Sequence, residues 1–120
     1  MTKLIKAKAS FIPVSPRKLR LISDAVKNLS IDMAISQLKI LPKAAGSIIL
    51  KVIQQAVANA KNNFKLSPAD LKIDSLTIGE GPRSKRSDRH AHGSRFGGGV
   101  RHKRTAHVIL NLTTKNGAKS

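Results

Sequence analysis

Hydrophobic and polar residues alternate near both ends of the chain, a pattern typical of strands with one buried face. At the N-terminal end, the apolar phase consists of Ile5, Ala7, Ala9 and Phe11, and the opposite phase of Leu4, Lys6, Lys8 and Ser10. At the C-terminal end, Ala106, Val108, Leu110 and Leu112 alternate with His107, Ile109 and Asn111. Between them, Leu71 and Ile73 follow one phase and Leu76 and Ile78 the other, which predicts a strand that bulges near residues 74–75.

Apolar residues recur at helical spacing in three segments between the first two strands. The first predicted helix has Ser15 as N-cap, Pro16 as its first residue and an apolar stripe of Leu19, Ile22, Val26 and Leu29. The second is capped by Ser30, presents Ile31, Ala34, Ile35 and Leu38, and is stopped by Pro42. The third spans about residues 43–62, with a wide apolar face formed by Ala45, Ile48, Ile49, Val52, Ile53, Ala56 and Ala60.

The predicted order is therefore a strand, three helices, a strand, a basic segment and a last strand, an α+β arrangement without internal repeats. Residues 81–104 connect the last two strands and contain only two bulky apolar residues, Phe96 and Val100. Such a segment has too little apolar surface to offset the entropy of ordering its backbone. Its position between two strands predicts a long β-hairpin, with Gly93 and residues 97–99 marking the tip.

The charge indicates what would order this hairpin. The chain has 120 residues, with 23 Lys and Arg against 6 Asp and Glu, and a formal net charge of +17. A self-repelling charge of this size favours a polyanionic partner, most simply nucleic acid. An anionic membrane is disfavoured because the chain has no Trp or Tyr for an interfacial anchor and no continuous apolar span. We expect a soluble, intracellular protein.

Arginine and lysine are distributed differently. Lysine occurs along the whole chain, whereas every arginine belongs either to Arg17 and Arg20 or to Arg83, Arg86, Arg89, Arg95, Arg101 and Arg104. The planar guanidinium binds phosphate through two donors and stacks on bases, which an ammonium cannot do. The sequence has no recognition helix, leucine heptad or zinc-finger spacing, so an arginine-rich segment that folds on binding indicates RNA rather than duplex DNA. The low aromatic content argues against an ordinary base-stacking platform.

Other chemistry has weaker support. Two of the histidines of the basic segment, His90 and His92, are spaced to share a metal, but surrounding cations disfavour this and the chain has no cysteine. The acidic residues are scattered without a paired arrangement for acid/base catalysis. We therefore predict no enzyme activity, no metal site and no cofactor.

Four motifs resemble those of the bacterial-type large-subunit ribosomal protein family number twenty-two. They are SPRKLRL at residues 15–21, AVANAKNN at 56–63, EGP at 80–82 with Lys85 and Arg86, and KRTAH at 103–107. Their order and spacing cover nearly the whole chain. The resemblance implies three helices against a three-stranded antiparallel sheet, with a basic β-hairpin that passes through ribosomal RNA to the nascent-peptide exit tunnel.

The resemblance also assigns roles to residues. It places Arg17, Lys18 and Arg20 against RNA near the body, and Arg83, Lys85, Arg86, Lys103 and Arg104 along the hairpin. The predicted RNA-binding set also includes Arg89, Arg95 and Arg101. Residues 89–100 would lie at the tunnel wall, where Arg89, His90, His92, Arg95 and Phe96 form the predicted tip. This chain departs from the family there, with DRHAHGSRF and three glycines in place of a proline and a compact basic run.

The prediction is thus one domain over residues 1–120, with a body of residues 1–81 and 105–114, a hairpin of 82–104 and a tail of 115–120. Its expected partners are large-subunit ribosomal RNA, neighbouring ribosomal proteins and the nascent peptide, with no membrane. The expected location is the cytoplasmic ribosome, and an organellar ribosome is an open alternative. A free-standing RNA- or DNA-binding chaperone is the second reading, and a metal-dependent protein that uses the histidines is the third.

Overall fold

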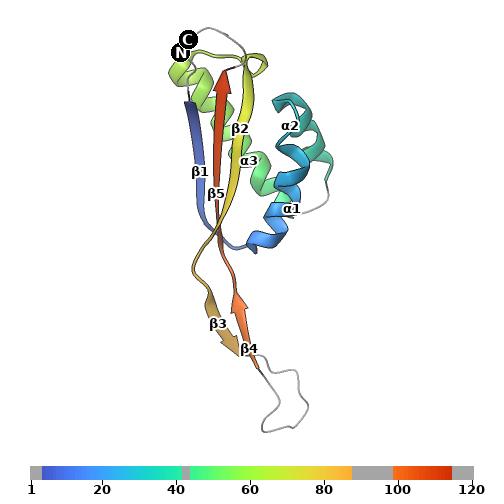
Figure 1. The fold of residues 1–120 in the computed structure, drawn as a ribbon, viewed down its shortest axis with the longest axis vertical. Helices are drawn as coiled ribbons and strands as arrows, with labels where there is room; N and C mark the ends of the chain where they lie inside the picture. Colours follow the sequence, from blue (N-terminus) through green and yellow to red (C-terminus); the bar gives the residue numbers. More distant parts are fainter. Residues whose placement is uncertain (1–3, 42–43, 88–98, 115–120) are drawn as a thin grey trace.

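A three-stranded antiparallel sheet with helices on one face forms the body of the protein (Figure 1). The computed structural model describes residues 4–41, 44–87 and 99–114. The sheet has the order β1-β5-β2, with β1 Leu4–Ile12, β5 Ala106–Thr114 and β2 Leu71–Glu80. The helices are α1 Pro16–Val26, α2 Ile31–Ile40 and α3 Ala44–Phe64, and a short 3-10 helix, η1 Pro68–Asp70, precedes β2. The predicted α+β fold is confirmed.

The helices begin where their capping residues predict. The Ser15 hydroxyl accepts a hydrogen bond from the Lys18 amide at 3.5 Å, and the Ser30 hydroxyl accepts one from the Met33 amide at 3.4 Å. Pro16 occupies the first turn of α1, where its missing N–H has no helical partner to lose. Helix α3 extends to Phe64, beyond the predicted residue 62, and the predicted start at residue 43 lies outside the described residues.

The core lies between the sheet and the helices. Helix α3 packs on β1 and β5, α1 packs on β2, and α2 packs on α3. The predicted apolar face of β5 is confirmed, since Ala106, Val108, Leu110 and Leu112 are each 0% exposed. The opposite phase of β5 is only half-buried, so the second face of the sheet is more open.

Both edge strands of this sheet contain irregularities in pairing. The predicted bulge in β2 is confirmed by a register shift between Ile73 and Ser75, which returns Ile78 to the buried face. In β1 the register also shifts, between Ala9 and Ile12. As a result Ile12 is buried and Phe11 is 66% exposed, so the prediction that Phe11 faces the core is wrong. The alternation could not reveal this bulge because Phe11 and Ile12 are both apolar.

Beyond the body, β3 Ser84–Ser87 and β4 Val100–Lys103 form a separate two-stranded antiparallel sheet, which we call the stem. Figure 1 shows the stem projecting from one end of the large sheet, and the molecule extends over 66 × 26 × 20 Å. Every stem residue is exposed. The pairing supports the stem of the predicted hairpin, whereas its predicted tip falls on residues 88–98, outside the described residues.

Among the described residues, no helix is both long enough and apolar enough to cross a membrane.

We expect the stability to depend on the side of the helices that faces the sheet. Replacing Ile49, which is 0% exposed in α3, by alanine leaves a cavity and should lower the free energy of unfolding by about 2–5 kcal/mol. The matched control I40A, at an 81% exposed position of α2, should change it by less than about 0.5 kcal/mol. Urea unfolding measures both, and equal effects would contradict the assigned core.

Candidate nucleic-acid interface

The two sheets are joined by a tight connection that we call the neck, residues 81–83 and 104–105. The last pair of the body sheet is Glu80 with Ala106, and the first pair of the stem is Ser84 with Lys103. Between them the Gly81 amide donates a hydrogen bond to the Thr105 carbonyl at 2.9 Å. The Thr105 hydroxyl donates another to the Pro82 carbonyl at 2.8 Å. These two bonds hold the strands together where the ladder is interrupted.

Gly81 is required by the close approach of the strands at the neck. A Cβ atom at this position would lie 2.4 Å from the Thr105 Oγ1 and 3.2 Å from the Thr105 carbonyl carbon and oxygen. Contacts this short with backbone atoms force the chain to shift. The dipeptide Gly81-Pro82 after a strand could have indicated a turn here, but only the structure identifies Thr105 as its partner.

The start of α1 lies beside Arg83 and Arg104 at the neck. A small recess there is lined by Pro16, Glu80, Gly81, Arg83, Arg104 and Thr105. Pro16 is the first residue of α1 and is followed directly by Arg17 and Lys18. The fold therefore brings the start of α1 beside the base of the stem, although these segments are far apart in the sequence. Two arginines from opposite sides of the neck, Arg83 and Arg104, therefore line one recess together with the first residue of α1.

One pair of the stem ladder consists of two arginines. Arg86 pairs with Arg101 and Lys85 pairs with His102. Alternation along the strands places Arg86 and Arg101 on the same face as Lys103. Like charges directly opposite one another destabilise a strand pair, and an isolated two-stranded hairpin is only marginally stable in water. An anion bound along this face would reduce repulsion between the two guanidinium groups.

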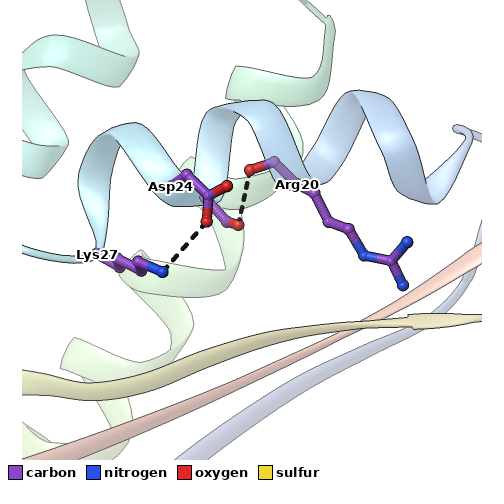
Figure 2. Close-up of polar contacts among 4 residues, drawn as sticks. Arg20, Asp24 and Lys27 are labelled. Carbon is purple, nitrogen blue, oxygen red and sulfur yellow. Dashed lines mark hydrogen bonds and ion pairs between the residues drawn. The ribbon is translucent and has the colours of Figure 1, made fainter.

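Arg20 has a structural contact that the sequence did not indicate. Its Nη2 donates a hydrogen bond to the Ile78 carbonyl at 3.1 Å, which ties α1 to β2. Figure 2 shows its guanidinium extending from α1, with Asp24 one helical turn further along the helix and Lys27 beyond it. Those two form an exposed ion pair at 3.3 Å, and the Ser23 hydroxyl donates to the Arg20 carbonyl at 3.1 Å. The guanidinium has further N–H donors, so this bond does not exclude the predicted RNA contact of Arg20, which stays a prediction.

The other predicted RNA-binding residues fall into three places. Arg17 and Lys18 lie in the first turn of α1, Arg83 and Arg104 in the neck, and Lys85, Arg86, Arg101 and Lys103 in the stem, and all are exposed. The fold thus places the start of α1 beside the neck, whereas the stem extends away from the body. The tip residues Arg89, His90, His92, Arg95 and Phe96 lie outside the described residues.

A metal site has no support within residues 4–41, 44–87 and 99–114, where no cluster of three or more His, Cys, Asp or Glu side chains occurs. The proposed histidine pair, His90 and His92, lies outside these ranges and stays untested.

Comparison with known proteins agrees with this arrangement. The family described as ribosomal protein L22p/L17e matches residues 7–113. The chain belongs to this family. Two relatives, from Mycoplasma capricolum and Mycoplasma mycoides, are each 41% identical over 105 residues, a match that covers 88% of this chain and 92% of the relative. Both are named large ribosomal subunit protein uL22. The resemblance is confirmed, and the family is structural rather than enzymatic.

Substitution of Gly81 tests the neck. G81A should lower the free energy of unfolding by about 1–3 kcal/mol because the added methyl group overlaps Thr105. T105A removes the nearest overlapping atom but leaves the backbone contacts at 3.2 Å, so the double variant should lose less stability than the sum of the single variants. Thermal unfolding of the four proteins gives this coupling. Simple additivity would mean that Thr105 does not restrict residue 81.

Proposed function

We propose that this protein is a structural constituent of the large ribosomal subunit that binds ribosomal RNA through its neck and stem. Family membership supports a structural ribosomal role. The single observation that carries the RNA-binding part is the meeting of Arg83 and Arg104 with the start of α1 at the neck. Phosphate groups of one folded RNA segment would contact the neck and the stem together, since both present exposed guanidinium groups.

The stem supports an RNA partner rather than a protein one. Its residues are exposed on both strands, and it has only one bulky apolar residue, Val100, for a protein surface to bury. Phosphates would neutralise the repulsion between Arg86 and Arg101 and would order the hairpin on binding. Binding of several RNA segments by body and hairpin gives the protein a role in subunit assembly, with neighbouring ribosomal proteins as further partners.

The third part of the proposal is that the hairpin reaches the nascent-peptide exit tunnel with residues 89–100. Its support is the family resemblance and the projection of the stem away from the core (Figure 1). A free-standing nucleic-acid chaperone would need no such fixed projection. Sedimentation of tagged protein separates the two functions, because a ribosomal constituent should cosediment with the large subunit in high salt and a chaperone should remain at the top of the gradient.

RNA binding should depend strongly on salt and on the position of the charges. In filter binding to large-subunit ribosomal RNA, R83Q/R86Q/R104Q should lose about two units of log-log salt slope, because each lost phosphate contact contributes about 0.7–0.9. The charge-matched control K39Q/K51Q/K61Q changes exposed residues of α2 and α3 and should keep the slope nearly unchanged.

A third variant, R83K/R86K/R104K, separates charge from geometry. It keeps the net charge of +17, so its slope should be retained, while its affinity should fall because forked and stacked contacts are lost. Equal slopes for the two glutamine variants would show that the neck and stem are not the binding surface.

Shortening the hairpin tests the tunnel role. Ser87 pairs with Val100, so residues 88–99 can be replaced by Asn-Gly, which closes a two-residue turn between them. The free energy of unfolding should change by less than about 0.5 kcal/mol, because Val100 is 63% exposed and the core lies elsewhere. The shortened protein should still enter the large subunit.

The tunnel contact is read by crosslinking. A nascent chain that carries a photo-crosslinker should label the full-length protein within residues 89–100 and should not label the shortened one. Labelling of other ribosomal proteins by the same nascent chain serves as the control. A crosslink that maps to the helices would contradict the tunnel assignment, and failure of the shortened protein to enter subunits would show that the tip is needed for assembly.

A further inference from the structure

Phe11 has a conformation that its own packing does not explain. Its φ angle is 56°, in the left-handed region, which is a genuine outlier for a bulky residue. The register shift that produces this angle also turns the side chain outward, where it is 66% exposed. A continuous strand would have placed Phe11 in the apolar phase of β1. The chain instead adopts a strained backbone that exposes an aromatic ring, and such strain clusters at functional sites.

His107 holds the bulge and the ring in place. The Phe11 amide donates a hydrogen bond to the His107 Nδ1 at 3.1 Å, in place of the ladder bond that the bulge removes. The two rings meet edge to face, with centroids 5.0 Å apart and planes at 89°. In such a pair one edge meets one face, so at least one face of the Phe11 ring is left uncovered by His107. Because Nδ1 is the acceptor, the neutral imidazole carries its proton on Nε2 as a further donor.

The surroundings of the ring suit one particular ligand. Across the sheet, His107 pairs with Gly79, which has no side chain to rise above the surface. Along the same face, Lys8 is exposed and pairs with Ile109, the next residue of that phase after His107. Thr105 of the neck lies two residues before His107. A flat ring, a bare glycine and a lysine therefore lie at the end of the sheet where the cationic neck begins.

We infer that Phe11 is a stacking site for one unpaired nucleobase of the bound RNA. The base stacks on the open face of the ring, its phosphate lies toward Lys8, and His107 acts as the positioning residue that fixes the ring. Stacking on an aromatic face is open to every base, and RNA offers unstacked bases in loops and bulges. The site deepens the proposed function and rests on it, since a strand that follows the stem and neck would arrive at Phe11.

The first test removes the ring in a way that relieves the strain. Glycine adopts a φ of 56° without a Cβ penalty, so F11G should melt no lower than the wild type. Its affinity for a single-stranded oligoadenylate of about 12 nucleotides should nevertheless fall about 5- to 150-fold, the loss expected for one stacked base. The log-log salt slope should stay unchanged, because no phosphate contact is removed. A melting temperature well below the wild type would show instead that the ring serves the fold.

A fluorescence test reads stacking directly. The chain has no Trp or Tyr, so F11W introduces the only fluorophore of its kind. Its emission should be quenched on addition of the oligoadenylate and much less by an RNA duplex of equal length, whose bases are already stacked. The control I40W places an indole at an 81% exposed position of α2 and should show little quenching with either RNA.

The outcomes distinguish the site from the proposed function. If the wild type binds oligoadenylate with a steep salt slope while F11G binds equally well and F11W is not quenched, the stacking site is wrong and RNA binding stands. If the wild type binds neither this RNA nor ribosomal RNA, the proposed function fails together with the site.

Discussion

The central strand β5 connects the stability of the protein to its function. It pairs with β1 on one side and β2 on the other, and its inward side chains are fully buried under the helices. The same stretch of chain enters β5 directly from the stem, through Arg104 and Thr105. The hairpin is therefore attached to the most firmly held strand of the core. A basic arm without apolar surface can keep a defined direction only if its base is fixed in this way.

The distribution of polar and apolar residues divides the molecule into two parts with different sources of order. The body buries a continuous apolar layer, which stabilises its fold. The stem has two arginines opposite one another and no buried side chain, so the feature on which the proposed RNA binding rests does not stabilise its free form. In the proposed function, the apolar core orders the body, whereas the free energy of phosphate binding orders the arm.

Much of the fold could be predicted from the sequence because the periodic signals were strong. Ser15, Ser30 and the apolar face of α3 defined the helices, and the opposed phases of β2 revealed its bulge. The bulge in β1 could not be predicted, because Phe11 and Ile12 are both apolar and the pattern does not indicate which of them occupies the buried position. For the site, the arginine placement indicated the candidate residues. The meeting of Arg83 and Arg104 with the start of α1 depends on how α1 packs beside β2, and the periodicity of the sequence does not reveal that packing.

Two constrained positions of the body, Gly81 and Phe11, lie at the end of the sheet that faces the stem. Gly81 leaves no room for a side chain beside Thr105, and Phe11 has a left-handed backbone held by His107. Thr105, the residue before β5, and His107 flank Ala106, the first residue of β5, which is fully buried. Because Ala106 is fixed in the core, β5 cannot move easily, and this keeps both the close contact at Gly81 and the left-handed backbone of Phe11 in place. In the proposed function, the stability of the core at this end of the sheet would preorganise exposed groups for the RNA.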